Sequence, residues 1–390
     1  MTTTRASTGL PEPVDRRTFL RRGGRLLGGA ALLGAAGPIA LLEACSSSAK
    51  TATSSTTVGG SATTAAASGP TTVAPGTYGA LTFQLPWIKN VESAPEFIAD
   101  TKGLYVQQGF SGVTLIAGGP NATPQETVIK TGQALIGITS TDSAAAAIQK
   151  GFNLKIIGTE YQKNPFCIMS AASKPLNTPQ DMIGKKIGVQ SVNDAVWAAF
   201  LKANSLDPTK ITKVAAGFDP TPLSQGQVDG WFSFITNEPI ALGLKGFKTT
   251  TFLLNDFNYP EVGNVLIVTT DSLKSSRAKV KAVMVATILA WKESLTNPAE
   301  GAMLAATKYG QGLDASEQTL ESKAQNQLVA TGDALTNGLL YITPAAQAAN
   351  VKTLGLGGTT VTADQVFDMT ILDEIYQAQP DLKSVPTPAP

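Results

Sequence analysis

From residue 81 onward, apolar and polar positions follow two alternating patterns. One is a short apolar run with the length of a buried strand, and such runs occupy 81–85, 113–116, 134–138 and 154–158. The other has the spacing of one face of a helix, and these segments are 94–102, 123–130 and 142–150. Strands that alternate with helices in this way predict an α/β architecture with mostly parallel sheets.

The same pattern then starts again. Further strands are predicted at 186–189, 211–215, 230–234 and 265–268, and the helices between them at 194–204, 223–227 and 239–244. A long apolar face over 278–295 begins a helical region that reaches residue 377. Two α/β units followed by a helical return predict two lobes. Proteins built in this way often bind a ligand at the carboxyl ends of the strands, between the lobes.

The N-terminal region has the features of an export signal. An Arg-Arg pair at 16–17 precedes an uncharged stretch over 26–42, which resembles the twin-arginine signal of bacteria. The stretch is shorter than the roughly 20 apolar residues of a membrane span, so a retained membrane anchor is the less favoured alternative. It ends in Leu-Leu-Glu-Ala before Cys45, which resembles a lipoprotein lipobox except at Glu43. We expect a signal peptide over 1–44 and a lipid on Cys45.

Two segments are predicted to be disordered. About half of residues 46–78 are Ser or Thr and only one is charged, so 45–78 is expected to be a flexible tether. The last segment, 380–390, contains four prolines and is expected to be a disordered tail. Cys167 has no cysteine partner once Cys45 carries a lipid, and we expect it to be buried as a small apolar side chain.

The composition excludes several classes of function. The chain has 30 basic and 29 acidic side chains, two cysteines and no histidine. Histidine is the commonest general base and zinc ligand, so we expect no catalytic residue, no metal and no cofactor. A net charge of +1 gives no reason to expect nucleic-acid binding. Removing 1–44 takes away six basic and three acidic groups, which leaves 24 against 26.

Four local sequences point to a family. The sequence Pro-Trp-Ile-Lys-Asn at 86–90 follows the first strand, and the next helix ends in Lys-Gly-Leu-Tyr at 102–105. Asp-Met-Ile-Gly-Lys-Lys-Ile-Gly-Val stands at 181–189 and Leu-Ser-Gln-Gly-Gln-Val-Asp-Gly at 223–230. Together they resemble the solute-binding proteins of ABC importers, in the class that binds thiamine precursors, riboflavin and sulfonates. The resemblance extends over about residues 80–300.

This resemblance implies a two-lobed periplasmic-binding-protein-like fold of type II. Each lobe is a mostly parallel sheet flanked by helices, and the lobes close on a small solute by hinge motion. The expected boundaries are 79–174 for the first part of lobe 1, 175–265 for lobe 2, and 266–379 for the return to lobe 1 with the C-terminal helices. The implied partners are the solute and an ABC permease. The chain is expected to be a monomer, anchored by its lipid on the extracytoplasmic face of the membrane.

Candidate ligand-binding residues lie where strands end. Trp87 follows the first strand, where its ring can stack on a flat heterocycle. The other candidates are Asn90, Glu92, Ser140, Thr141, Asp142, Tyr161, Ser191, Asn193, Asp194, Asn237 and Glu238. Each has a structural alternative, because the same residue types cap helices or complement the positive end of a helix dipole.

The ligand class follows from these side chains. Trp87, Asn90 and Glu92 favour a small aromatic heterocycle, of the thiamine-pyrimidine-precursor or riboflavin type. The alternative is an aliphatic sulfonate, taurine or nitrate bound at the Ser- and Thr-rich helix starts. Arg277 is the only arginine of the sequence beyond the N-terminal region, so a bidentate arginine clamp on an anion is disfavoured.

Two other classes of function stay open. One is a sensor or adhesin that never meets a permease. The other is a pyrimidine-synthesising enzyme of the same fold, but that enzyme consumes an active-site histidine and this chain has none.

Overall fold

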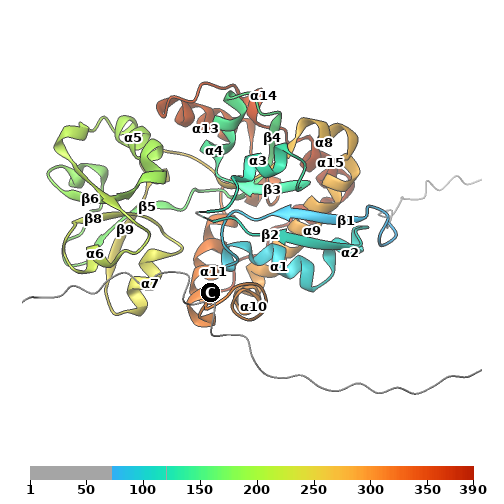
Figure 1. Cartoon of the computed structure of the whole chain (residues 1–390), viewed down its shortest axis with the longest axis horizontal. Helices are drawn as coiled ribbons and strands as arrows, with labels where there is room; N and C mark the ends of the chain where they lie inside the picture. Colours follow the sequence, from blue (N-terminus) through green and yellow to red (C-terminus); the bar gives the residue numbers. More distant parts are fainter. Residues whose placement is uncertain (1–72, 120) are drawn as a thin grey trace, which may run out of the picture. The chain divides into compact units, whose positions relative to one another are not determined.

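The computed structural model describes residues 73–119 and 121–390 (Figure 1). The expected signal peptide over 1–44, Cys45 and most of the tether lie outside the described residues. Within the described residues, no helix has both the length and the apolar character needed to cross a membrane.

Two five-stranded sheets organise the chain, and Figure 1 shows them as separate groups of strands. The first sheet, with the helices packed on it, is called lobe 1. Its strands, in order across the sheet, are β2 (Gly112–Ile116), β1 (Ala80–Gln84), β3 (Ile136–Thr139), β10 (Gly263–Thr269) and β4 (Leu154–Tyr161). The second sheet belongs to lobe 2. Its strands are β7 (Thr212–Ala216), β6 (Lys186–Gln190), β8 (Gly230–Phe234), β5 (Phe166–Ala171) and β9 (Thr249–Leu253).

One strand in each sheet runs against the others. β10 is antiparallel to both β3 and β4, and β5 is antiparallel to both β8 and β9. Both are the strands that enter a sheet directly from the other lobe. A chain that crosses over arrives at the edge where the other strands end, so the entering strand must run in the opposite direction. The sheets are therefore mixed, with the remaining strands parallel as predicted.

Helices cover the sheets of both lobes. Those before the first crossover and after the second are α1 (Ala94–Thr101), α2 (Leu104–Gln107), α3 (Gln125–Lys130), α4 (Thr141–Gln149), α8 (Thr270–Ser275), α9 (Arg277–Thr296), α10 (Pro298–Leu304), α11 (Ala315–Val329), α12 (Ala334–Asn337), α13 (Pro344–Leu356), α14 (Ala363–Val366) and α15 (Thr370–Ala378). Those between the crossovers are α5 (Asp194–Ala203), α6 (Thr221–Ser224) and α7 (Glu238–Leu244). The buried helix α9 packs against α1, α2 and α15.

Each lobe has its own apolar core. In lobe 1 the strand residues Phe83, Ile138 and Leu266 pack with Trp291 of α9. In lobe 2 Ile168, Phe200 and Phe232 form the corresponding core. Cys167 is fully buried, as predicted. Because the cores are separate, the edges at which the strands of the two sheets end remain available for a site.

The structure differs from the predicted elements in three places. β5 and β9 were not predicted as strands. β9 is rich in Thr and shows no clear apolar period, whereas β5 has an apolar run over 166–169 that was not assigned to a strand. The tail over 380–390 is not a free segment: it begins with a 3₁₀ turn (Pro380–Lys383), and the backbone N–H of Ala389 donates to the carbonyl of Leu295 at 2.8 Å.

The body also begins before residue 79. The backbone N–H of Tyr78 donates to the carbonyl of Gly109 at 2.9 Å, and the ring of Tyr78 lies 5.5 Å from that of Phe110. The end of the predicted tether therefore packs on lobe 1, because Tyr78 has an apolar surface to cover.

Candidate functional site

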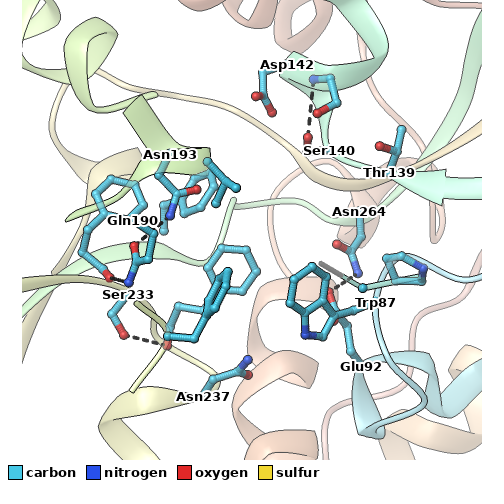
Figure 2. Close-up of a pocket in the computed structure, with 18 of the residues that line it drawn as sticks. Trp87, Glu92, Thr139, Ser140, Asp142, Gln190, Asn193, Ser233, Asn237 and Asn264 are labelled. Atoms are coloured by element: carbon cyan, nitrogen blue, oxygen red, sulfur yellow. Dashed lines mark hydrogen bonds between the residues drawn. The ribbon is translucent and has the colours of Figure 1, made fainter. Parts of the chain in front are cut away.

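A cavity of about 320 Å³ is lined by residues of both lobes. In Figure 2, Trp87, Glu92, Asn264, Thr139, Ser140 and Asp142 lie on one side, and Gln190, Asn193, Ser233 and Asn237 on the other. The remaining lining residues are Pro86, Gly119, Gln125, Ser143, Phe166, Val192, Phe218, Phe232, Phe234 and Glu238. Most of them follow the carboxyl end of a strand, which is where α/β sheets bind ligands.

The loop after β1 places Trp87 in the cavity wall. The carbonyl of Trp87 accepts a hydrogen bond from the Gly118 N–H at 2.8 Å, and the Gln125 side chain donates to the carbonyl of Pro86. A Cβ atom at Gly118 would lie 2.6 Å from that Pro86 oxygen, so the close approach requires glycine. The ring of Trp87 lies 5.8 Å from the ring of Phe218, which comes from lobe 2.

Glu92 lies in a 3₁₀ turn, η2 (Val91–Ser93), that α11 holds from behind. The Val91 N–H donates to Oε1 of Gln318 at 2.7 Å, and Nε2 of Gln325 donates to the Val91 carbonyl at 3.0 Å. Both backbone groups of Val91 are thereby satisfied by side chains far along the chain. The turn is consequently rigid, and it directs the neighbouring Glu92 carboxyl into the cavity.

Asn264, at the start of β10, joins Glu92 to a second carboxyl. Its Nδ2 donates to Oε1 of Glu92 at 3.2 Å and to Oε2 of Glu160 at 3.3 Å. The backbone of Asn264 is left-handed, with a φ of 50°, a conformation that Asn tolerates better than most residues. Burial raises the pKa of Glu92 to about 7, although the Asn264 hydrogen bond opposes this shift.

The start of α4 contributes hydroxyls and a carboxyl. Ser140 is its N-cap, and the Ser140 Oγ accepts from the Ser143 N–H at 3.4 Å. Thr139 donates its hydroxyl hydrogen bond to Glu126. Asp142 lines the cavity, and its buried Oδ1 has no hydrogen-bond partner among the described residues. This helix start carries a carboxylate of its own, which opposes the binding of an anion there.

Lobe 2 presents side chains that bond mainly to one another. Nε2 of Gln190 donates to the Phe232 carbonyl at 3.0 Å, and Nδ2 of Asn193 donates to Oε1 of Gln190 at 2.9 Å. Oε2 of Glu238 accepts from the Ser233 hydroxyl at 2.8 Å and from the Phe234 N–H at 3.0 Å. Burial raises the pKa of Glu238 above its usual range.

The structure brings seven of the predicted site residues to the cavity: Trp87, Glu92, Ser140, Asp142, Asn193, Asn237 and Glu238. Five others do not line it. Asn90 instead accepts a hydrogen bond from the Glu92 N–H at 3.2 Å as a helix cap, and Thr141 is buried and donates to the Val262 carbonyl at 2.7 Å. The role of Asn90 is the capping alternative that the sequence also allowed, whereas Thr141 bonds to the segment that leads into β10.

The three remaining predicted residues are also directed elsewhere. Tyr161 is buried and donates to Oε1 of Gln325 at 3.1 Å. Ser191 is exposed, and Asp194 pairs with Lys213 at 2.6 Å on the surface. Residues at one strand end thus diverge within a single helical turn, because successive side chains there point to different sides.

Sequence reasoning missed the phenylalanines and Asn264. Phe166, Phe218, Phe232 and Phe234 all line the cavity, but in the sequence they resemble ordinary strand and core residues. For Asn264 the available signal was an amide next to Gly263 at the start of a strong apolar strand. Its contacts with Glu92 and Glu160 could not be inferred from spacing.

The charge of the cavity has a single sign. Three carboxyl groups line it, those of Glu92, Asp142 and Glu238, and no lysine or arginine of the described chain does. No group of His, Cys, Asp or Glu within residues 73–119 and 121–390 is arranged to hold a metal ion. The site is thus an aromatic-lined pocket with hydrogen-bond acceptors.

A family model described as "NMT1/THI5 like" matches residues 90–301, more than half of the chain. The chain belongs to the NMT1/THI5-like family. It is 25% identical over 238 residues to the riboflavin-binding protein RibY of Chloroflexus aurantiacus, which covers 60% of this chain and 67% of that protein. It is 23% identical over 164 residues to the 4-amino-5-hydroxymethyl-2-methylpyrimidine phosphate synthase of Legionella pneumophila, covering 42% of this chain and 51% of the synthase.

Solved structures agree on the fold. The periplasmic aliphatic sulphonate binding protein SsuA of Escherichia coli superimposes with a TM-score of 0.59 at 17% identity, over 74% of this chain and 92% of that structure. The periplasmic nitrate-binding protein NrtA of Synechocystis PCC 6803 gives 0.58 at 14% identity, over 80% and 93%.

These comparisons confirm the predictions of the family and of the periplasmic-binding-protein fold. They also confirm the predicted class of function, a solute-binding protein of ABC importers that is related to riboflavin, sulfonate and nitrate binders. Of these proteins, RibY, SsuA and NrtA are named as binding proteins, and the Legionella pneumophila relative is named as a synthase.

Proposed function

We propose that this protein captures a flat, nitrogen-containing aromatic heterocycle that is neutral or cationic, and delivers it to an ABC permease. The observation that carries the proposal is the lining of the cavity, which combines Trp87 and four phenylalanines with three carboxyl groups and no described basic side chain. Aromatic faces bind flat rings by stacking. Carboxylates accept hydrogen bonds from ring N–H and amino groups.

An anionic ligand fits this lining poorly. A sulfonate or nitrate needs cations or several free N–H donors, and the N–H groups at the start of α4 lie beside Asp142. Bringing an anion next to two or three carboxylates adds like-charge repulsion in a partly buried space. The heterocycle is therefore favoured over the sulfonate, taurine or nitrate alternative.

The receptor role is favoured over an enzymatic one. The synthase relative aligns over about half of its own length, and the chain has no histidine for a pyrimidine synthesis of that kind to consume. A sensor or adhesin could use the same cavity without a permease. Binding to a permease is therefore the finding that distinguishes the receptor from a sensor or adhesin.

The proposal includes the route to the membrane. The Arg-Arg pair at 16–17 and the sequence before Cys45 support twin-arginine export and lipid attachment on the extracytoplasmic face. A lipid anchor with more than one acyl chain would keep a monomeric receptor close to its permease.

A melting screen of the full chain tests the ligand class. Intrinsic fluorescence is followed on heating with riboflavin, 4-amino-5-hydroxymethyl-2-methylpyrimidine, taurine, an alkanesulfonate and nitrate. A ligand that binds only the folded state stabilises it by about 2.7 kcal/mol at a hundredfold excess over its Kd. We expect an increase in Tm with a heterocycle and no increase with the anions.

Two variants localise the binding. Trp87→Ala should abolish most of the shift in Tm. Ile88→Ala is the matched control, because Ile88 is the next residue, is 46% exposed and does not line the cavity. A shift with the anions alone would contradict the proposed ligand class.

A further inference from the structure

Behind the cavity wall of lobe 1 lies a buried group of acids. We call Glu92, Glu96, Glu160 and Asn264 the carboxyl cluster. Asn264 bridges Glu92 and Glu160, and Oε1 of Glu160 accepts from the indole N–H of Trp291 at 3.1 Å. Glu96 and Glu160 are both fully buried.

The carboxyl cluster has little to compensate its charge. Neither carboxyl oxygen of Glu96 has a hydrogen-bond partner among the described side chains and backbone. The polar partners of the other two acids are Asn264 and Trp291, which are neutral donors. A buried carboxylate without a cation is costly, and such groups keep a proton instead. Adjacent buried acids are therefore not all ionised at the same time.

The backbone conformation of Asn264 suggests that the bridge between Glu92 and Glu160 is functional. Asn264 has a left-handed backbone inside a strand, with a φ of 50°, and such conformations cluster at functional sites because the surroundings must enforce them. The bridge lies at the point where the chain re-enters lobe 1 from the second crossover. Its two hydrogen bonds hold two carboxyl groups together, one at the cavity and one in the core.

Only Glu92 of the three acids lines the cavity. Its proton is thus the one that a ligand or the water of an open cleft can reach. We propose that Glu92 carries an exchangeable proton in the empty site at neutral pH, and that a ligand N–H displaces this proton when it binds. The proposal rests on the proposed function, because it names how that same site responds to pH.

The exchange balances as follows. The O–H bond of Glu92 breaks and the proton passes to water in the cleft and then to buffer. The carboxylate that remains accepts a hydrogen bond from the ligand N–H. Affinity therefore increases as the pH rises through the pKa of Glu92, which burial raises to about 7, and acidification favours release.

Other titratable groups face this site from every element that surrounds it. Those on lobe 1 are Glu96 of α1, Tyr105 of α2, Asp142 of α4, Glu160 and Tyr161 of β4, and Glu321 of α11; Glu238 of α7 faces it from lobe 2. None of them is basic, so none opposes the retention of the proton on Glu92 that burial causes.

The first experiment needs no ligand. The full chain is labelled with ¹³C at glutamate carboxyls, and its NMR signals are followed as the pH changes. The Glu92 signal is identified by its loss in Glu92→Gln. We expect this signal to titrate near neutral pH. Asn264→Ser should raise the pKa of Glu92, because a hydrogen bond to the ionised form is lost. Titration near the ordinary value of about 4.3 would overturn the proposal.

The second experiment counts protons during binding. Riboflavin is the main probe, because it is neutral near pH 7 and its imide carries an N–H; 4-amino-5-hydroxymethyl-2-methylpyrimidine is the second. Calorimetry in two buffers of different ionisation enthalpy gives the protons released. We expect a fraction of one proton at neutral pH, and a Kd that falls about tenfold from about pH 6 to about pH 8.

Two variants assign the proton. Glu92→Gln cannot release one, so its proton count should drop to zero and its Kd should no longer change over this range. Glu321→Gln is the matched control, because burial raises the pKa of Glu321 to about 8 as well and it does not line the cavity. It should keep the release.

The outcomes separate the two proposals. Binding of a probe without proton release overturns the inference and leaves the proposed function standing. If neither probe binds, the ligand class of the proposed function is wrong, and the NMR titration alone decides whether Glu92 holds the proton.

Discussion

The two walls of the cavity are built differently. On the lobe 2 wall, Gln190, Asn193 and Ser233 bond to neighbours in the same lobe, and the Glu238 carboxylate receives two hydrogen bonds. On the lobe 1 wall, buried acids without compensating cations lie behind Glu92. Asn264, whose backbone is left-handed, donates hydrogen bonds to Glu92 and Glu160.

The difference indicates which wall of the cavity determines the choice of ligand. A wall whose polar groups are already satisfied presents a stable surface of rings and amides to any flat ligand. A wall with incompletely satisfied acids gains more from the correct hydrogen-bond donors. We therefore expect changes in lobe 1 to have larger and more pH-dependent effects than matched changes in lobe 2.

The largest expected effect is that of Glu96→Gln. Burial raises the pKa of Glu96 to about 8, so the folded chain holds this proton more tightly than the unfolded chain. The native advantage is complete below about pH 4.5 and is lost as the pH rises through about 8. Removing the ionisable group should stabilise the protein by about 5 kcal/mol near pH 9 and by less than about 1 kcal/mol near pH 5.

Urea denaturation at both pH values measures this effect. Glu238→Gln in lobe 2 is the comparison, and its gain at high pH should be smaller because hydrogen bonds from Ser233 and Phe234 already favour the ionised Glu238. Equal gains in the two variants would remove the distinction between the walls.

The next effect in size is that of Asn264→Ala, which removes the bridge and places Ala at a φ of 50°. We expect a loss of about 2 kcal/mol of unfolding free energy. Asn264→Gly should recover part of it, because glycine adopts this conformation without strain. Asn193→Ala in lobe 2 removes a single hydrogen bond and should cost about 0.5 kcal/mol. An equal loss in Asn193→Ala would contradict the comparison.

A smaller difference is expected between the two facing rings. Trp87→Ala should weaken the binding of a heterocycle roughly tenfold or more, since it removes the larger aromatic surface. Phe218→Ala should weaken it only a few fold, because Phe218 is 50% exposed. Calorimetric titration with the heterocycle that raises the Tm compares the two, and a greater loss for Phe218→Ala would move the main contact to lobe 2.

The smallest effect is expected for Asp194→Asn. Asp194 pairs with Lys213 on the surface, with its side chain 50% exposed, and such pairs contribute about 0 to 1 kcal/mol. Ligand affinity should not change, because Asp194 does not line the cavity. A marked loss of affinity would return this residue to the binding site.

Much of the fold could be predicted from the sequence. The apolar runs at 81–85, 186–189 and 265–268 lie within β1, β6 and β10 or extend one residue beyond them, because alternation and run length are local properties. The strand β9 was missed because its threonines mask the period. The site was predicted only in part: Trp87 and Glu92 reach the cavity, but Asn90, which lies between them, caps a turn.

The sequence by itself determined most of the order of strands and helices, the family and the loops that end at the cavity, since these depend on residues close together in the chain. Only the tertiary structure decided which side chains enter the cavity and that Glu92, Glu160 and Asn264 meet. Asn264 is 172 residues from Glu92 and 104 from Glu160. Such contacts depend on how strands from two crossovers pack, and no local period encodes that packing.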